Sequence, residues 1–189
     1  MHNTDTFTGP SFSLGNRLAR LTWNVCHVLL FRYSPVFMHR WRAFLLRCFG
    51  AKIGRRAHVY PRVRIWAPWN LDIGEEAGIG NDVILYAQDR ISIGRRAVIS
   101  QGAHICTGTH DHEQWGHPLV TRPILIGDHV WVAAEAFIHP GIRLGEGCIV
   151  GARAVVTKDM PAWMVCAGHP CVPLKPRKKF DDIRIDTHI

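Results

Sequence analysis

The sequence lacks the features that mark secreted, disulfide-bonded and membrane-spanning proteins. No two of its six cysteines form a C-x-x-C pair, so free thiols in a reducing compartment are expected. The most apolar run, VCHVLLF at residues 25–31, contains a histidine and is too short to span a bilayer. The first residues do not combine a charged segment, an apolar run and a small-residue cleavage site. These absences predict a cytoplasmic protein.

Acidic residues are scarce as well. The chain has 15 Asp and Glu against 23 Lys and Arg, a formal net charge of +8, which favours an anionic partner such as nucleic acid, membrane headgroups or a phosphate-bearing small molecule. Nucleic acid is not expected, because the basic residues show no interleaved aromatic platform and no recognisable reader fold. With 47% hydrophobic residues over 189 positions, the chain is expected to form one domain with an appendage.

What the sequence does contain is a six-residue repeat. From residue 53 an aliphatic residue, often followed by glycine, recurs at every sixth position in five sets of three. The sets are Ile53, Val59, Ile65; Ile73, Ile79, Leu85; Ile93, Ile99, Ile105; Ile126, Val132, Ile138; and Leu144, Val150, Val156. A period of six does not fit an amphipathic helix. It fits a short strand plus a turn, three units to a triangular coil, with the aliphatic residues stacked in an interior column.

The spacing between coils locates a protruding loop. The first aliphatic residues of the first three coils are twenty residues apart, two more than three hexads need, and the extra pairs fall at one corner. A larger insertion, residues 107–123, falls at that corner too and contains three histidines. Loops held by a rigid scaffold often carry function, so this loop is the first place to look for a site.

Residues 13–50 show helical spacing instead. The apolar positions that predict a first helix are Leu18, Leu21, Trp23, Val25, Val28 and Leu29. Pro35 suits the first turn of a second helix, and Gly50 suits its end. The pair is expected to cover the open end of the solenoid, although basic amphipathic helices also fit peripheral contact with a membrane. The predicted organisation is a helical cap at 1–50, a solenoid at 51–172 with the inserted loop 107–123, and a basic tail at 173–189.

The repeat, the loop and the segment VVTKDMPAWMVCAGHPCVPLK resemble the hexapeptide-repeat O-acetyltransferases over about residues 50–176. Three segments, WRAFLLRCFGAKIG, VISQGAHICTGTHDH and GARAVVTKDMPA, are most similar to the colanic-acid and exopolysaccharide biosynthesis branch. Galactoside and maltose acetyltransferases are more distant relatives. The resemblance implies an all-β, left-handed parallel β-helix, a homotrimer with acetyl-CoA bound between subunits, and a sugar or polysaccharide precursor as acceptor.

The family's catalytic histidine matches His110 in TGTHD. Acetyl transfer from a thioester to a hydroxyl needs a group that removes the hydroxyl proton, and a neutral imidazole does this near pH 7. His112 and His117 are then loop or acceptor-contact residues. A carboxylate or carbonyl is expected to orient His110, but the sequence does not identify it. Asp111 is adjacent, and neighbouring side chains rarely face each other.

Acetyl-CoA contacts are implied by the same resemblance. The backbone N–H of Ala134 would stabilise the developing oxyanion, and four further residues match positions that contact the pantetheine arm and the nucleotide. These four are Ala152, Thr157, Lys158 and Lys175. The chain departs from its relatives at Val172, where they carry an arginine; Arg177 or Lys178 could supply the missing charge.

The acceptor contacts do not carry over. The sugar-binding Asn and Asp of the galactoside enzymes align with Gly80 and Gln88, which lack the matching groups. Asn81 and Asp82 are the nearest polar candidates for holding the acceptor. The resemblance therefore predicts a substrate outside that galactoside class.

Three alternatives are weighed against this interpretation. γ-type carbonic anhydrases share the predicted solenoid and bind zinc through histidines, for which His112 and His117 with His104 or His139 would be the ligands. That alternative leaves the acyltransferase-like tail without a role, and no metal is expected. A Cys106–His110 pair would be a nucleophile and base, but a cysteine next to a column residue more often only packs. A non-catalytic scaffold is the third alternative.

Overall fold

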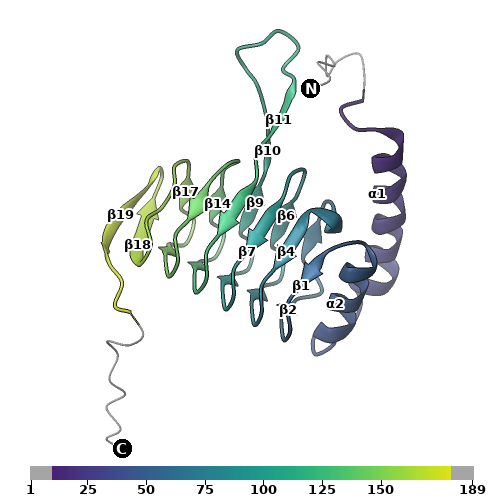
Figure 1. The fold of residues 1–189 in the computed structure, drawn as a ribbon, viewed down its shortest axis with the longest axis horizontal. Helices are drawn as coiled ribbons and strands as arrows, with labels where there is room; N and C mark the ends of the chain where they lie inside the picture. The colour runs from purple at the N-terminus through teal and green to yellow at the C-terminus, as the bar shows by residue number, and fades with distance from the viewer. Residues whose placement is uncertain (1–9, 180–189) are drawn as a thin grey trace, which may run out of the picture.

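Each hexad forms a strand of two or three residues followed by a turn, and successive turns wind the chain into a triangular solenoid (Figure 1). The computed structural model describes residues 10–179. Five complete coils stack in parallel register, and a partial sixth begins where Met160 pairs with Leu144. The predicted parallel β-helix is confirmed.

Three sheets form the sides of the solenoid. The first contains β1 (Lys52–Ile53), β4 (Leu71–Ile73), β7 (Ile91–Ile93), β12 (Ile124–Ile126) and β15 (Arg143–Leu144). The second contains β2 (His58–Val59), β5 (Gly78–Ile79), β8 (Val98–Ile99), β13 (Trp131–Val132), β16 (Ile149–Val150), β18 (Met164–Gly168) and β19 (Cys171–Pro176). The third contains β3 (Arg64–Ile65), β6 (Ile84–Tyr86), β9 (His104–Cys106), β14 (Phe137–Ile138) and β17 (Val155–Val156). A 3-10 helix, η2 (Pro68–Asn70), occupies one corner.

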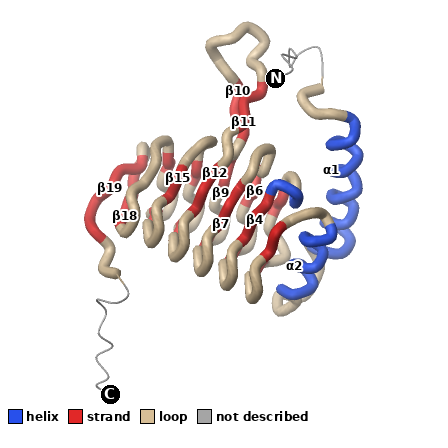
Figure 2. The backbone as a smooth tube through the Cα atoms, in the orientation of Figure 1, coloured by secondary structure: helices blue, strands red, loops and turns tan. Residues whose placement is uncertain are grey.

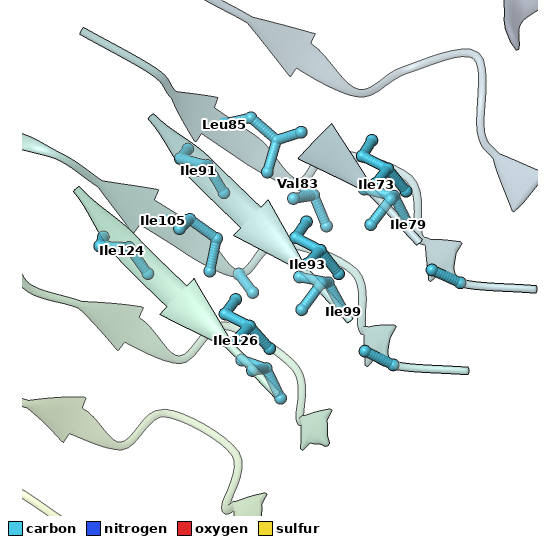
Figure 3. Packing of buried hydrophobic residues seen from close by; sticks show 14 of the residues in the cluster. Ile73, Ile79, Val83, Leu85, Ile91, Ile93, Ile99, Ile105, Ile124 and Ile126 are labelled. Carbon is cyan, nitrogen blue, oxygen red and sulfur yellow. The ribbon is translucent and has the colours of Figure 1, made fainter. Parts of the chain in front are cut away.

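The core is the predicted aliphatic column. Ile73 pairs in register with Ile53 on one side and Ile93 on the other, so equivalent residues of successive coils stack directly. All fifteen repeat residues identified in the sequence are buried, and Figure 3 shows the side chains of coils two to four pointing into one interior. Burial of such side chains contributes roughly 1.5–3 kcal/mol each, which makes the solenoid the rigid frame of the molecule.

The helices stand at the open end of the first coil (Figure 1). They are α1 (Leu14–Cys26), a π-helical continuation η1 (His27–Phe31), and α2 (His39–Cys48). Ser13 caps α1 by accepting a hydrogen bond from the Asn16 N–H. Gly50 follows α2 with a φ of +86°, as predicted, because this left-handed conformation favours glycine. No helix in the described part of the chain is both long and apolar enough to cross a bilayer.

The helices satisfy backbone groups that the first coil leaves open. The first coil has no preceding coil whose N–H groups donate to its carbonyls, and unpaired backbone groups are costly when buried. Each side of the triangle has one such carbonyl that accepts from a helical side chain. Trp23 Nε1 donates to Ile65 at 2.8 Å, Arg42 Nε to Val59 at 2.6 Å and Arg47 Nη2 to Ile53 at 2.7 Å. The helical segment therefore ends the solenoid by hydrogen bonding as well as by packing.

Because the first coil needs hydrogen-bond donors, α1 turns its polar and aromatic side chains toward the solenoid and its aliphatic side chains toward solvent, the reverse of an ordinary amphipathic helix. Of the six apolar residues that predict the first helix, only Trp23 is buried. The others are 48–68% exposed, since the coil end attracts N–H donors and aromatic rings to the inner side. Helical spacing gives the period of the helix correctly, but it does not tell which face is covered.

The prediction that Pro35 opens the second helix is wrong. Helix α2 begins at His39, and residues 34–36 form a loop before it. The physical reason is Arg42, whose guanidinium donates hydrogen bonds to the carbonyl oxygens of Pro35 and Val36. The Pro35 carbonyl accepts from Arg42 and from the Met38 N–H in an isolated turn, and the Val36 carbonyl accepts from Arg42, so the regular helix begins only at His39.

At the other end, the chain closes the solenoid with a hairpin. β18 continues the second sheet parallel to β16, and β19 returns antiparallel to β18. The boundary drawn between residues 172 and 173 falls inside β19. Residues 1–9 of the predicted cap and 180–189 of the predicted tail lie outside the described residues.

Candidate active site

The insertion at residues 107–123 forms an arm that projects from one corner of the solenoid (Figure 2). It leaves β9 and returns to β12 through an antiparallel pair, β10 (Gly108–His110) and β11 (Leu119–Thr121). Thr107 fixes its base: this buried residue donates from Oγ1 to the Tyr86 carbonyl at 2.8 Å and accepts from the Asp89 N–H at 2.9 Å. The arm therefore leaves the frame in a defined direction.

His110 is the last residue of β10, and its side chain is exposed. Its Nδ1 lies 2.6 Å from the backbone carbonyl oxygen of His117. Because a carbonyl oxygen can only accept, Nδ1 carries the hydrogen, and in the neutral ring Nε2 keeps its lone pair. The arrangement orients the imidazole with a basic nitrogen directed away from its partner. It also identifies the orienting group that the sequence does not reveal.

The other two arm histidines are placed differently. His117 contributes its backbone and adopts a φ of +44° in a turn. The His112 side chain is 84% exposed, with Nε2 3.1 Å from a Glu113 carboxylate oxygen. Asp111 accepts hydrogen bonds from the Glu113 N–H and from Gln114 Nε2, so its carboxylate organises the tip of the arm instead of orienting His110.

No zinc site emerges from these residues. His104 lies on β9 of the third sheet and His139 directly follows β14, each against the ring of Phe137. Within residues 10–179 no three His, Cys, Asp or Glu residues are grouped so that they could hold a metal ion. The four histidines of the zinc alternative are therefore not assembled within this part of one chain.

Cys106 does not have the properties of a nucleophile. Burial raises the pKa of its thiol, and the S–H donates a hydrogen bond to the Gly108 carbonyl at 3.2 Å. A protonated, buried thiol is a weak nucleophile. The residue packs at the base of the arm.

The predicted binding residues follow the two edges of the third sheet. One edge is formed by the turns that lead from the second sheet into the third. These turns contain Asn81 and Asp82 in coil two, Ala134 in coil four and Ala152 in coil five. Thr157 and Lys158 follow β17, at the same edge from which the arm departs. No hydrogen bond or ion pair among residues 10–179 joins any of them to His110.

Among these residues, the backbone of Ala134 is notable. Its carbonyl accepts from the Arg153 N–H, whereas its own N–H has no hydrogen-bond partner within the described chain. Ala134 is half-buried, so a bound group can reach the N–H. Asp82, by contrast, is engaged: Arg62 Nη2 donates to its carboxylate at 2.8 Å, and the Arg62 N–H donates to Asn81 Oδ1.

The tail residues lie on the terminal hairpin. Lys175 is exposed on β19 and pairs with Val165 of β18. Val172 is 48% exposed on the same strand. Arg177, one candidate for the missing charge, donates to the His129 and Gly147 carbonyls at 3.0 and 2.8 Å. Its guanidinium therefore fastens the tail to two coils.

A row of rings on the outward face of the third sheet was missed by the sequence reasoning. Trp66, Tyr86, His104 and Phe137 come from successive coils, and His139 follows Phe137 two residues later in the same coil, with ring centroids 6.2, 6.1, 4.8 and 5.1 Å apart. Burial and nearby Arg64 lower the pKa of His104. The outward positions of the hexads were the available signal, but the rings come together only when the coils stack. The row runs between the two edges that hold the predicted site residues.

The chain is similar to known acetyltransferases over most of its length. The family model described as "Bacterial transferase hexapeptide (six repeats)" matches residues 123–158. The colanic acid biosynthesis acetyltransferase WcaF of Escherichia coli (strain K12) is 42% identical over 178 residues, 94% of this chain and 98% of that protein. The structure of a maltose O-acetyltransferase from Clostridium difficile 630 superposes with a TM-score of 0.80 at 27% identity, covering 88% of this chain and 90% of that one.

A further structure shows the same fold at lower identity. It is the hexapeptide-repeat acetyltransferase VCA0836 of Vibrio cholerae O1 biovar eltor complexed with acetyl coenzyme A, with a TM-score of 0.81 at 21% identity over 90% of this chain and 93% of that one. The family and the fold predicted from the repeat, the loop and the tail are thereby confirmed. The chain belongs to the hexapeptide-repeat acetyltransferases, and its solenoid is the left-handed parallel β-helix of that family.

Proposed function

We propose that this chain transfers the acetyl group of acetyl-CoA to a hydroxyl of a sugar or polysaccharide precursor, with His110 as general base. The observation that carries the proposal is the contact between His110 Nδ1 and the His117 carbonyl. It leaves Nε2 free to accept the hydroxyl proton as the oxygen attacks the thioester carbonyl carbon. The similarity to WcaF and the acetyl-CoA complex of the Vibrio protein support the donor and the acceptor class.

The reaction then proceeds through protein groups on the third sheet. Attack forms the new C–O bond, and the carbonyl oxygen becomes an oxyanion that the free N–H of Ala134 stabilises. Collapse breaks the C–S bond, and the protonated imidazole returns its proton to the departing CoA thiolate. Ala152, Thr157, Lys158 and Lys175 hold the CoA chain, while Asn81 and Asp82 are the candidates for the acceptor.

The site is proposed to form between subunits of a homotrimer. In one chain the arm projects from its corner, and no contact in the described residues ties His110 to Ala134. In the proposed trimer the arm of one subunit contacts the third-sheet face of the next, which brings His110 of one chain close to Ala134 of its neighbour. Because the donor is acetyl-CoA and all six cysteines are free thiols, the proposed site of action is the cytoplasm.

The test is acetyl-CoA consumption against a panel of sugars and lipid-linked oligosaccharides. Acceptor-dependent CoA release should fall about 10²–10⁴-fold in His110→Ala, the usual contribution of a general base. His112→Ala is the matched control and should keep its activity. Acceptor-dependent release that survives His110→Ala would exclude His110 as the base, and no release with any acceptor would favour a non-catalytic scaffold.

Mixed trimers test the shared site. His110→Ala and Ala134→Trp should each be inactive as homotrimers, the second because the indole fills the space beside the N–H. When the two variants are co-expressed and form one trimer, the Ala134→Trp chain supplies an intact arm and the His110→Ala chain supplies an intact Ala134. One interface of the trimer then has both groups. Partial recovery of activity supports a site between subunits, whereas no recovery in a verified mixed trimer contradicts it.

A further inference from the structure

Helix α1 presents its aliphatic side chains to solvent. This outer face continues onto η1: it consists of Leu14, Leu18, Leu21 and Val25 of α1 with Val28 and Leu29 of η1, all 48–68% exposed. The opposite face carries Arg20, Trp23, His27 and Phe31, which contact the solenoid or one another. A surface helix ordinarily buries its aliphatic stripe. The outer face of α1 is therefore a packing face that the described chain leaves without a partner.

The exposed apolar surface continues beyond α1. Leu30, Tyr33, Val36, Phe37 and Phe44 are 48%, 77%, 52%, 82% and 54% exposed. Trp41 connects the two helical segments, because its Nε1 donates to the Leu30 carbonyl and its ring stacks on Phe44 at 5.8 Å. We call the outer face together with these five residues the helical-end surface. Contiguous apolar surfaces of this kind mark interaction sites.

The charges around this surface are of one sign. From residue 10 to residue 71 the chain contains no Asp or Glu, and the next acidic residue is Asp72. The same stretch contains eleven basic residues, namely Arg17, Arg20, Arg32, Arg40, Arg42, Arg47, Lys52, Arg55, Arg56, Arg62 and Arg64. Arg17, Arg32 and Arg40 are exposed beside the apolar residues. A partner that fits this surface must therefore offer an apolar region for the exposed aliphatic and aromatic side chains, and anionic groups for the arginines beside them.

A basic pocket borders the helical-end surface. It lies between α2 and the first coil, has a volume of about 660 Å³, and is edged by Phe37 and Phe44. Its charged and titratable lining is Arg40, Arg47, Arg55, Arg56, His39 and His58. Glu75 and Glu76 of the next coil pair with Arg55 and Arg56. Arg47 donates to the Ile53 carbonyl, while Arg40 lines the pocket from α2 and is exposed. Arginine binds phosphate oxygens with two parallel hydrogen bonds, so the pocket suits a lipid phosphate.

We propose that the helical-end surface docks onto an anionic lipid bilayer. Helix α1 spans residues 14–26, about 20 Å at 1.5 Å per residue, and η1 continues it to residue 31. The two lie in the plane of the interface with their aliphatic side chains inserted. The arginines contact lipid phosphates at the rim. A second copy of the chain fits this surface less well, because it would bring the exposed Arg17, Arg32 and Arg40 of one copy against the same three arginines of the other.

Vesicle flotation of the full chain tests this proposal independently of acetyl transfer. The protein should float with vesicles of phosphatidylcholine containing about 30 mol% phosphatidylglycerol, and much less with phosphatidylcholine alone. Added salt should weaken the binding, because screening reduces attraction between basic residues and anionic lipid. Equal binding to both vesicle types, or no binding to either, would overturn the proposal.

A matched pair of variants on α1 sharpens the test. Leu21 belongs to the outer face, whereas Ala19 is exposed two residues away, turned by about 200° around the helix. Leu21→Glu should reduce binding to anionic vesicles more than about tenfold, while Ala19→Glu, which adds the same charge, should change it less than about threefold. Melting temperatures establish that both variants fold. Equal losses in the two variants would contradict insertion of the outer face.

The second-copy alternative has its own readout. Light scattering of the wild type and of Leu21→Glu gives their masses in solution. An unchanged mass together with lost vesicle binding supports the membrane surface. If Leu21→Glu halves the mass and the wild type does not float, the surface pairs with another copy and the proposal fails.

Discussion

The Nδ1 atom of His110 lies 2.6 Å from the carbonyl oxygen of His117, across the antiparallel arm. Two histidines that look equivalent in the sequence therefore contribute different groups. His110 contributes its ring, and His117 contributes its backbone. The close spacing of histidines in this loop indicates a turn that orients one imidazole.

The role of the His117 backbone predicts that its side chain can be replaced. His117 has a φ of +44°, a conformation that asparagine tolerates well, so His117→Asn keeps the carbonyl in place. Its kcat should stay within about threefold of the wild type, against a loss of about 10²–10⁴-fold in His110→Ala. Steady-state kinetics with a saturating acceptor measures both. A loss in His117→Asn as large as that in His110→Ala would show that the His117 ring takes part.

Thr107 should position the arm. Thr107→Val keeps the shape of the side chain but removes its hydrogen bonds to the Tyr86 carbonyl and the Asp89 N–H. The free energy of unfolding should fall by about 1–2 kcal/mol, and kcat should fall while KM for acetyl-CoA changes little. Urea denaturation and kinetics test the two parts.

Thr109→Val provides the comparison for Thr107, because Thr109 is an exposed threonine on the same arm. It should change the free energy of unfolding by less than about 0.5 kcal/mol. Similar destabilisation by the two substitutions would mean that the hydrogen bonds of Thr107 do not hold the base of the arm.

The solenoid was predictable because equivalent residues of successive coils have the same surroundings. Each aliphatic residue, such as Ile79 or Ile99, occupies the same position in its coil, so one local rule fixes all of them. The arm was found as an interruption of that rule. The orientation of α1 was not predictable, because it depends on carbonyls of Ile65, Val59 and Ile53 that only the assembled coil presents.

The candidate site also has one part that could be predicted from the sequence and other parts that could not. His110 could be singled out because the sequence around it matches a family motif. Its partner could not, since a backbone carbonyl such as that of His117 leaves no mark in the sequence. The ring row on the third sheet was missed for a related reason: His104 and Phe137 are 33 residues apart, and the arm that separates them hides the register.

Arg42 should be the side chain that holds the helical segment on the first coil. It is fully buried, and its guanidinium donates to the Val59, Pro35 and Val36 carbonyls and to the Ser34 hydroxyl. Arg42→Met leaves these acceptors without their donor, so the free energy of unfolding should fall by about 3 kcal/mol. Urea denaturation followed by tryptophan fluorescence measures the change.

The neighbouring Arg40 serves as the control for Arg42. It lies on the same helix but is exposed, so Arg40→Met should cost less than about 0.5 kcal/mol. An effect of Arg42→Met as small as that of Arg40→Met would show that the buried guanidinium contributes no net stability, since its own desolvation would then offset its hydrogen bonds.

Acidification should destabilise the fold through the half-buried His27 and His39 of the helical segment. Burial lowers the pKa of His27, and Arg32 lowers it further, while the hydrogen bond to the Val63 carbonyl acts in the opposite direction. Burial also lowers the pKa of His39. Between the lowered pKa of the folded state and the ordinary value of about 6.5, the unfolded chain binds more protons than the native one. Stability therefore rises with pH in that window and falls as the pH drops through it.

Urea denaturation at about pH 7.5 and about pH 5.5, on either side of the ordinary histidine pKa, should show a lower free energy of unfolding in acid. His27→Gln removes one of the responsible groups and should reduce the difference between the two pH values. His112→Gln is the matched control, since the His112 side chain is 84% exposed, and it should leave that difference unchanged. A difference that persists undiminished in His27→Gln would assign the acid sensitivity to another group.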